Sequence, residues 1–349
     1  MKLLILTQVV DTNDSVLGFF HRWIEEFSKH ADSITVICLK EGEHHLPPNV
    51  RVFSLGKEKG RVSRLQYAVR FWRLIWREHR NYDVVFVHMN VEYVMLGGPL
   101  WRLWGKKVGL WYLHKSVSLR LRVAVFFANH VFTGTKQSLR LETPKLHIMG
   151  QGIDVETFSS IAKQMPEVFT VLFVGRLSPI KGVETLIEAA SILRKKGMLL
   201  RVEIIGGADT LDQVTYLQKL QNLVAKENLW EIVSFVGPVK NELLPTRLAR
   251  ASVFVNTSRT GSLDKAGIEP MAMALPVVSC NDSYAAIVGP YGLFYEEGDA
   301  VTLADILQRL ADEPKEAERI GAALQTEARQ YHNLATLVPA ILKILQNQN

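Results

Sequence analysis

The hydrophobic residues of the chain occur in short runs separated by longer mixed segments. Runs of four to nine residues that are apolar on both faces are typical of parallel strands covered by helices on both sides. The runs in the first half are KLLILTQVV, ITVICL, VRVFSL, DVVFVHM, KVGLWYL, HVFTG and LHIMG, and those in the second half are FTVLFVG, RVEIIGG, VSFVG, SVFVNTS, PVVSC and GLFY. Helical periodicity falls between them at 18–30, 61–79, 182–197, 212–226 and 302–323. This alternation predicts an α/β protein with parallel sheets.

The strands divide into two sets of about six, which favours two doubly wound domains over a single eight-stranded barrel. Residues 150–168 interrupt the strand rhythm, and a fresh strand follows them. We therefore predict a first domain at 1–160 and a second at 161–333, which suits a chain of 349 residues. The last helix, within 334–349, is expected to pack back on the first domain.

Composition narrows the class of protein. With 48% hydrophobic and 22% charged residues, the chain is ordinary globular protein. Cys38 and Cys280 are far apart and lack metal-type spacing, which indicates a reducing compartment. The first apolar run is short and acids follow it, unlike a secretory signal, and no stretch of about 18 apolar residues occurs. A cytoplasmic location is expected.

Charge is unevenly distributed along the chain. The net charge is +6, yet residues 51–150 hold 18 Lys and Arg against 5 Asp and Glu, a local excess of +13. The remaining residues are mildly acidic. A strongly basic block of this kind predicts an anionic partner located on one part of the protein.

Two cations follow a strand in FVGRLSPIKGVETLIEA. Arg176 and Lys181 lie in the turn after the strand, and a helix is predicted to begin near Gly182. Ligands of doubly wound sheets bind at the carboxyl ends of strands, and a helix start offers free N–H groups. These residues therefore predict an anion site. The alternative is that both are ordinary loop cations surrounded by solvent. No GxGxxG or Walker pattern occurs.

A second cluster lies in NTSRTGSLDKAGIEPMAMALPVVSC, residues 256–280. Glu269 is predicted to stand at the start of a helix, with Pro270 in its first turn. The carboxylate would then either cap this helix or accept the two hydroxyls of a ribose.

The second half resembles glycosyltransferase family 4, the retaining, nucleotide-sugar-dependent enzymes of the GT-B fold. The matching elements occur in the order FVGRLSPIKGVETLIEA, VEIIGGA, VSFVGPVKNELLPTRLARASVFVNTS and GIEPMAMALPVVS. The resemblance implies two facing Rossmann-like domains with a cleft between them. It places the diphosphate on Arg176 and Lys181 and the ribose on Glu269. The other donor-binding positions that it implies are Gly18, Gly207, Val236, Gly237, Leu244, Leu263, Asp264 and Lys265.

The chain departs from the family at one position. The family has a further Glu eight residues before the ribose-binding Glu, where this chain has Gly261. That contact to the donor sugar is therefore missing or is made by Asp264 or Lys265. As a plain alternative, these two residues would form a surface ion pair.

Residues 1–150 resemble the family more loosely. His114, at the end of VGLWYLH, falls where the family places a His beside the transferred sugar, and His88 is a weaker candidate of the same kind. Asn13 and Asp14 are expected either to bind an acceptor hydroxyl or to form a turn and a helix cap. We predict His114, Arg176 and Lys181 as catalytic and Asn13, Asp14 and His88 as acceptor-binding.

The basic block contains RVSRLQYAVRFWRLIWREHR, residues 61–80, with six arginines and four large aromatics. Leu65, Val69, Trp72 and Trp76 have helical spacing and are expected to face the sheet, leaving a solvated Arg face. The same mixture of cations with Trp and Leu recurs within 101–122. It also suits an anionic membrane surface near the cleft, whereas no nucleic-acid motif is present.

The resemblance implies a retaining hexosyltransferase that moves a sugar from a UDP- or GDP-linked donor to an acceptor hydroxyl. A lipid-linked or cell-envelope glycan is the expected acceptor, as in polysaccharide biosynthesis. No cofactor and no metal are expected, since the chain lacks an Asp-rich metal pair. The alternatives are a GT-B nucleotide-sugar epimerase and a non-catalytic protein that binds nucleotide-sugars or membranes.

Overall fold

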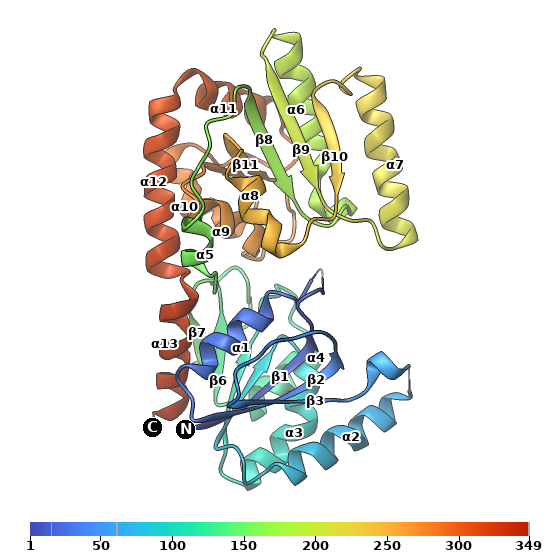
Figure 1. The fold of residues 1–349 in the computed structure, drawn as a ribbon, viewed down its shortest axis with the longest axis vertical. Helices are drawn as coiled ribbons and strands as arrows, with labels where there is room; N and C mark the ends of the chain where they lie inside the picture. Colours follow the sequence, from blue (N-terminus) through green and yellow to red (C-terminus); the bar gives the residue numbers. More distant parts are fainter. Residues whose placement is uncertain (15, 61, 348–349) are drawn as a thin grey trace. The chain divides into compact units, whose positions relative to one another are not determined.

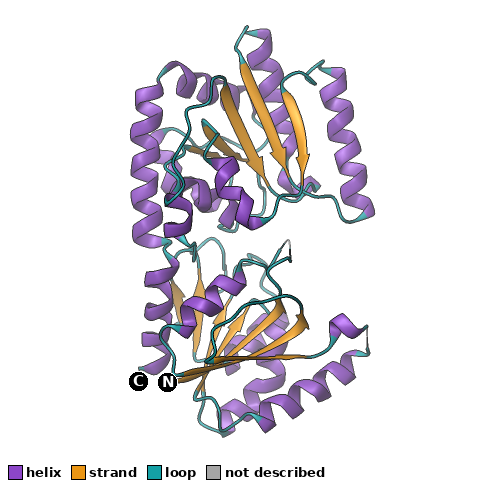
Figure 2. Cartoon of the chain, viewed as in Figure 1, coloured by secondary structure: helices purple, strands orange, loops and turns teal. Residues whose placement is uncertain are grey.

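The computed structural model describes residues 1–14, 16–60 and 62–347, which form two α/β units (Figure 1). The first unit contains residues up to Gly152 together with the last helix, and the second spans Ile153–Asn333. Arg61 of the predicted helix 61–79 and residues 348–349 of the predicted last helix lie outside the described residues. Each unit has a parallel sheet, so the predicted α/β class is confirmed (Figure 2).

The first unit has a seven-stranded parallel sheet in the order β3-β2-β1-β4-β5-β6-β7. Its strands are β1 (Lys2–Val10), β2 (Ser33–Glu41), β3 (Val50–Ser54), β4 (Val84–His88), β5 (Lys107–Trp111), β6 (His130–Thr133) and β7 (Leu146–Ile148). Its helices are α1 (Phe20–Ser28), α2 (Arg64–Arg77), α3 (Val91–Leu103), α4 (Leu119–Phe127) and α13 (Leu334–Gln346).

Alternate residues of the central strands feed two separate cores, one on each face of this sheet. Leu4 and Leu6 of β1 pack with Phe71 and Ile75 of α2 and with residues of α3 and α4. Leu3 and Ile5, which point the other way, pack with residues of α1 and α13. Because a strand alternates its side chains, an unbroken apolar run can fill both cores.

The second unit has a five-stranded parallel sheet in the order β10-β9-β8-β11-β12. Its strands are β8 (Phe169–Val174), β9 (Leu200–Ile205), β10 (Val233–Gly237), β11 (Val253–Asn256) and β12 (Val277–Ser279). Its helices are α5 (Val155–Ser159), α6 (Val183–Lys195), α7 (Leu211–Lys226), α8 (Leu244–Leu248), α9 (Lys265–Ala272), α10 (Ala285–Val288), α11 (Ala300–Asp312) and α12 (Pro314–Tyr331). The chain leaves β8 toward one edge through β9 and β10, and later returns to build β11 and β12 on the other side.

Several predicted bounds differ from the structure. The helix expected at 302–323 is two helices, because Pro314 cannot continue α11 and instead opens α12 at its first position. GLFY forms only an isolated bridge, between Ser279 and Phe294. Residues 153–160, which we assigned to the first domain, lie in the second unit, where α5 packs beside α9.

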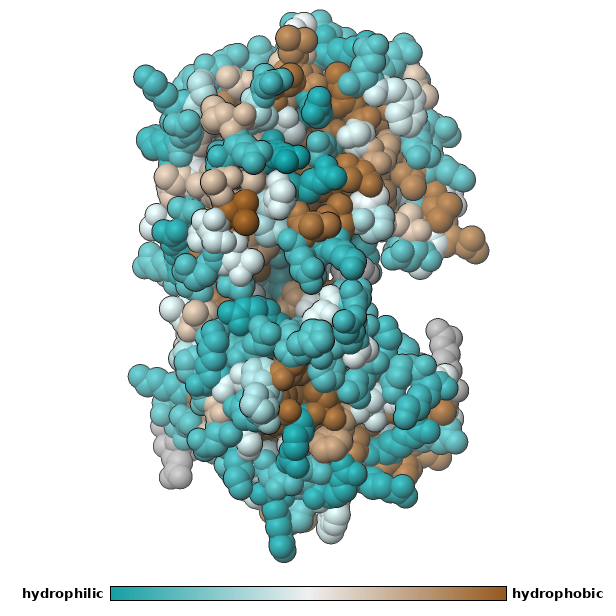
Figure 3. All heavy atoms as spheres, in the orientation of Figure 1, coloured by the Kyte–Doolittle hydropathy of each residue, from teal (hydrophilic) through white to brown (hydrophobic). Residues whose placement is uncertain are grey.

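The orientation expected for helix 61–79 is wrong. Leu65, Val69, Trp72 and Trp76 are exposed, and it is Phe71 and Ile75 that lie against the sheet. Apolar surface over α2 is visible among hydrophilic side chains in Figure 3. Two apolar stripes of helical period coexist in this segment, and the core has taken the other one. Among the helices of the described residues, none is long and apolar enough to cross a membrane.

Helix α13 should be a major source of stability for the first unit. Replacing the buried Ile341 by Ala should lower the free energy of unfolding by about 2–5 kcal/mol, because it leaves a cavity between α13 and the sheet. Urea unfolding followed by tryptophan fluorescence measures this, since Trp230 is the one tryptophan of the sequence outside the first unit. The exposed Gln346→Ala is the control and should be near neutral. Equal stability of the two variants would contradict the packing of α13.

Candidate functional site

The candidate site lies at the carboxyl ends of β8 and β11, the neighbouring strands at which the second sheet changes direction. Chain leaving β8 turns toward β9, whereas chain leaving β11 turns toward β12. The chain therefore leaves these two strands toward opposite sides of the sheet, and this point of a doubly wound sheet is the usual place for a ligand.

The loop after β8 carries both predicted phosphate-binding cations. Arg176 is exposed, and Lys181 ends a short 3₁₀ turn, Pro179–Lys181. Gly182 follows with φ 57°, and a Cβ atom there would lie 2.9 Å from the Thr257 carbonyl oxygen. Glycine is therefore required for the left-handed turn and for the close approach of the β11 loop. Helix α6 begins at the next residue, as the sequence predicted.

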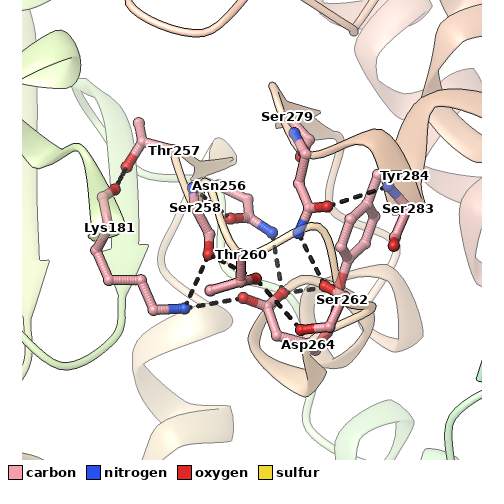
Figure 4. Close-up of polar contacts among 11 residues, drawn as sticks. Lys181, Asn256, Thr257, Ser258, Thr260, Ser262, Asp264, Ser279, Ser283 and Tyr284 are labelled. Atoms are coloured by element: carbon pink, nitrogen blue, oxygen red, sulfur yellow. Dashed lines mark hydrogen bonds and ion pairs between the residues drawn. The ribbon is translucent and has the colours of Figure 1, made fainter. Parts of the chain in front are cut away.

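Lys181 links the two loops. Its Nζ lies 3.0 Å from Oδ2 of Asp264 and donates to the Ser258 hydroxyl at 3.1 Å (Figure 4). The Thr257 hydroxyl donates to the backbone carbonyl of Lys181. Both charged side chains of the pair are largely buried, with 15% and 21% of their side-chain surface exposed. The structure thus joins two of the predicted donor-binding residues, which come from different loops.

Asp264 is held by further donors. The Asn256 amide donates to its Oδ1 at 3.0 Å, and the Tyr284 hydroxyl lies 3.1 Å from the same atom. Burial, together with the neighbouring Asp264 carboxylate, raises the pKa of Tyr284 well above its usual value, so this hydroxyl keeps its proton. Charge-assisted hydrogen bonds of this kind fix both the carboxylate and, through it, the lysine.

The sequence did not reveal the polar residues that support this pair. Asn256 ends β11 and Ser258 follows it, Asn281 and Ser283 follow β12, and all four are buried. The Ser283 hydroxyl donates to the Gly261 carbonyl at 2.8 Å, and the Asn281 amide to the Ser262 carbonyl at 2.9 Å. The sequence did contain one indication of this cluster, because the apolar runs of β11 and β12 lead into the polar tripeptides NTS (256–258) and NDS (281–283). Polar residues that are buried in this way need hydrogen-bond partners.

Glu269 does not stand at the start of a helix. Helix α9 begins at Lys265, so Glu269 is its fifth residue and Pro270 lies inside it. The prediction that Glu269 stands at the start of this helix is therefore wrong, and so is the alternative that it caps the helix. Asp264 is the residue before the helix, and its side chain makes no cap because it is turned toward Lys181 and Asn256.

Glu269 and Lys265 lie one turn apart in α9 and are both partly buried. Burial raises the pKa of Glu269 to about 7, and Asp264 adds to this, while Lys265 opposes it. Burial also lowers the pKa of Lys265 well below its usual value. A carboxyl group with a pKa near 7 and a lysine with a lowered pKa are the kind of perturbed groups that cluster at functional sites. Asp264, which the sequence analysis considered as a partner of Lys265, forms an ion pair with Lys181.

The remaining predicted donor-binding positions lie near the ends of neighbouring strands. Gly207 follows β9, and its carbonyl accepts from the Leu177 N–H at 3.0 Å, which ties it to the Arg176 loop. Val236 and Gly237 end β10, the latter with φ 82°, and the next residue is Pro238. Leu244 opens α8 and is buried, as is Leu263. Burial makes these two leucines part of the core of the second unit.

Arg176 is not drawn into the Lys181 cluster, and among the described residues no ion pair to it occurs. A further cation that the sequence analysis missed is Arg259 in the β11 loop. It lies 3.1 Å from a Glu297 carboxylate oxygen and 3.7 Å from one of Glu184. Arg259 is therefore neutralised within the fold, whereas Arg176 remains available to a ligand.

The predicted residues of the first domain's N-terminal loop make local contacts. Oδ1 of Asp14 accepts from the N–H groups of Val16 and Leu17 at 3.0 and 2.8 Å. The Asn13 amide donates to Glu43 at 2.9 Å. Gly18 lies two residues before α1, and a Cβ there would be 2.6 Å from the Asp14 carbonyl oxygen. Asp14 thus forms a turn, as one alternative expected, but it does not cap α1, whose N-cap residue Phe19 has no side-chain hydrogen bond.

His114 and His88 differ in exposure. His114 lies in the loop after β5 and is exposed, and its Nδ1 accepts from the Ser116 N–H at 3.1 Å, which places the proton of the neutral ring on Nε2. His88 ends β4 but is buried, with its ring stacked on Phe20 at 4.0 Å between centroids. Of the two, His114 is the side chain that a substrate can reach.

No group of three or more His, Cys, Asp or Glu side chains that could hold a metal ion occurs within residues 1–14, 16–60 and 62–347. Metal independence stays a prediction.

Sequence comparison identifies relatives of part of the chain. Residues 168–313 match the model of the family "Glycosyl transferases group 1". The D-inositol 3-phosphate glycosyltransferase of Streptomyces griseus subsp. griseus is 30% identical over 167 residues, which are 46% of this chain and 35% of the relative. The amylovoran biosynthesis glycosyltransferase AmsK of Erwinia amylovora is 30% identical over 195 residues, 53% of this chain and 46% of the relative. The aligned parts thus span less than half the length of these two relatives.

Structural comparison extends over the whole chain. Anabaena Alr3699/HepE in complex with UDP has a TM-score of 0.79 at 20% identity, with 99% of each chain covered. Sucrose-phosphate synthase of Thermosynechococcus elongatus has a TM-score of 0.77 at 16% identity, with 99% of this chain and 98% of that one covered. With its two parallel-sheet α/β units, this protein has the GT-B fold.

Because the pKa of Glu269 is raised, we predict that the free energy of unfolding depends on pH in a specific way. The folded protein holds this proton up to about pH 7, whereas the unfolded chain releases it near pH 4.5. Its contribution to the free energy of unfolding therefore falls as pH rises from about 4.5 to about 7. Glu269→Gln should remove that fall and be more stable than the native protein by on the order of 1–3 kcal/mol at pH 8.

Calorimetric melting of both proteins from pH 5 to pH 8 measures the difference. Glu188→Gln on the exposed face of α6 is the matched control and should follow the native profile. A Glu269→Gln profile parallel to the native one would show that this carboxyl group titrates normally.

Proposed function

We propose that this protein is a glycosyltransferase that moves a hexosyl group from a nucleoside diphosphate sugar to an acceptor hydroxyl. The observation that carries the proposal is the junction of Lys181 with Asp264 and Ser258 at the point where the second sheet changes direction. It lies within the segment that matches the group 1 glycosyl transferases. UDP is bound in one structural neighbour, and UDP with glucose in another structure of the same protein.

The cations of the β8 loop would bind the diphosphate. An ammonium has three hydrogens, of which Asp264 and Ser258 engage two, so Lys181 can add a phosphate oxygen without leaving its partners. Arg176 is exposed and can bind two phosphate oxygens at once. Because negative charge grows on the diphosphate as the sugar–phosphate bond breaks, both groups would stabilise the transition state more than the bound donor.

Asp264 would act as a positioning residue. Asn256 and Tyr284 fix its carboxylate, and the carboxylate fixes the Lys181 ammonium before the donor arrives. A hydrogen-bond donor that is already in position, such as this ammonium, needs no rearrangement at the moment of reaction. The cost of this arrangement is that the Asp264 charge opposes a second anion nearby, which the additional cation Arg176 offsets.

Glu269 would accept the ribose hydroxyls. Only the ionised carboxylate is an acceptor at both oxygens, and the pKa of this group is about 7. Binding through Glu269 should therefore strengthen as pH rises through neutrality.

His114 would contact the transferred sugar through Nε2–H, since its Nδ1 is engaged by Ser116. Retention of anomeric configuration, independence of metal and an envelope-glycan acceptor are parts of the same proposal. They rest on the resemblance of the motifs to family 4.

A non-catalytic nucleotide-sugar-binding protein is the second candidate, and one observation favours it. Gly261, which stands where family 4 has a sugar-contacting Glu, brings no side chain, and its carbonyl accepts from Ser283 within the fold. Turnover separates the two functions, because both require nucleotide binding but only one releases nucleoside diphosphate from the donor.

Arg176→Ala and Lys181→Ala should each slow the release of nucleoside diphosphate from the correct sugar donor by about 10²–10³-fold. Losses of this size follow the removal of one preorganised hydrogen-bond donor from a transition state. The correct donor is first found as the nucleotide-sugar that raises the melting temperature of the native protein. Arg201→Ala and Lys219→Ala, exposed cations of the same unit, are matched controls and should behave as the native protein does.

Nucleotide binding that is lost in both variants, without any turnover by the native protein, would favour the non-catalytic function. Turnover that survives both substitutions, with folding intact by circular dichroism, would overturn the proposed site.

A further inference from the structure

Helix α2 carries an apolar stripe that remains largely exposed. The side chains of Leu65, Val69, Trp72 and Trp76 are 69%, 47%, 39% and 61% exposed. A different face of the helix packs on the sheet through Phe71 and Ile75, which are almost fully buried. Leaving four large apolar side chains in water is unfavourable, and a contiguous exposed patch of this kind is typical of an interaction surface.

The stripe runs straight along the helix. Its residues follow one another at intervals of four, three and four, which keeps them on one side of an α-helix. With a rise of 1.5 Å per residue, the stripe from Leu65 to Trp76 is about 16 Å long. It is therefore long and narrow, a shape that lies along a flat surface.

The tryptophans of this face are held in place. Nε1 of Trp72 donates to the Leu96 carbonyl of α3 at 2.9 Å, so its polar edge is satisfied while its ring remains partly exposed. The Trp76 ring lies edge-on to Trp104, with 5.6 Å between centroids. Beside Trp104, Leu103 at the end of α3 is exposed, which widens the patch.

Three arginines of this segment are available to an anion. Arg64, Arg73 and Arg80 are exposed, and within the described residues no ion pair involves them. The other two described arginines of the segment serve the fold, since Arg70 donates to the Leu55 carbonyl at 2.6 Å and Arg77 lies 2.9 Å from Glu78. Glu78 is the segment's one acid and is buried, so the outer face of α2 presents cations without compensating acids.

We propose that the outer face of α2, with the adjoining end of α3, binds the surface of an anionic lipid bilayer. An amphipathic helix with Trp and Leu on one strip and Arg at its sides is the composition that lies in the headgroup region, with apolar groups reaching the acyl boundary and cations among the headgroup phosphates. Tryptophan is suited to this interface because its ring is apolar and its N–H is polar.

Charge complementarity decides between a bilayer and a second copy of the chain. The segment that contains α2 to α4 belongs to a block with a local excess of 13 positive charges, so two such faces would repel each other. A bilayer rich in anionic headgroups supplies opposite charge and apolar volume together. The protein would lie on the bilayer through this face.

The test uses the full chain and vesicles of phosphatidylcholine, with or without 30% phosphatidylglycerol as the probe mixture (on the order of the anionic content of natural membranes). The native protein should float with the anionic vesicles, bind them more weakly as salt is raised, and show quenching of tryptophan fluorescence by brominated acyl chains. Arg73→Gln with Arg80→Gln should weaken binding about 25-fold, since each cation near the surface contributes about fivefold.

Leu65→Ser with Trp76→Ser should weaken binding at least about tenfold and remove most of the quenching. The matched controls lie in the second unit, where Leu211 and Trp230 are similarly exposed, and Leu211→Ser with Trp230→Ser should bind as the native protein does. Arg201→Gln with Arg329→Gln is the charge control. Should Trp76→Ser disturb folding through Trp104, Leu65→Ser with Val69→Ser tests the same stripe.

Three results would overturn the proposal. These are no binding of the native protein to anionic vesicles, equal loss in the control variants, and concentration-dependent self-association that the stripe variants abolish without any vesicle binding. Nucleotide binding is measured separately and should be unchanged in all these variants, so failure of the membrane proposal leaves the proposed glycosyl transfer intact, and the reverse is also true.

Discussion

The ion pair between Lys181 and Asp264 organises the candidate site, because it joins the loops that leave the two strands at which the second sheet divides. Gly182 permits the close approach of these loops, and Asn256 and Tyr284 hold the carboxylate that holds the lysine. Parallel strands deliver their loops to one edge of the sheet, so a short stretch of chain after each strand is enough to assemble the cluster. A ligand can therefore bind the third hydrogen of the Lys181 ammonium, which these contacts hold in place, and the exposed Arg176 guanidinium five residues earlier in the sequence.

Most of the fold could be predicted from the sequence, because unbroken apolar runs can be satisfied only in a sheet buried on both faces. Leu3 to Leu6 of β1 feed two cores in alternation, and this requires helices on both sides. The errors arose where local signals were weak or competed. Pro314 ends a helical pattern that apolar periodicity alone would continue, and GLFY has the composition of a strand but pairs through a single bridge.

The site could be predicted less completely than the fold, since residue types near a motif do not state where side chains point. Asp264 and Lys265 were adjacent candidates, yet only Asp264 turns toward Lys181, while Lys265 enters α9 beside Glu269. Pro270 suggested a helix start, but α9 begins five residues earlier. In α2 two apolar stripes of the same period compete for the core, and volume and packing, which the sequence does not show, select Phe71 and Ile75 over the tryptophans.

The most direct measurement is a crystal structure of this protein with a nucleoside diphosphate bound. The account predicts that the two phosphate groups lie within hydrogen-bonding distance of the Lys181 ammonium and the Arg176 guanidinium, with Asp264 still in contact with Lys181 and the ribose on Glu269. A diphosphate bound elsewhere, with Lys181 still enclosed by Asp264 and Ser258 and Arg176 directed into solvent, would contradict it.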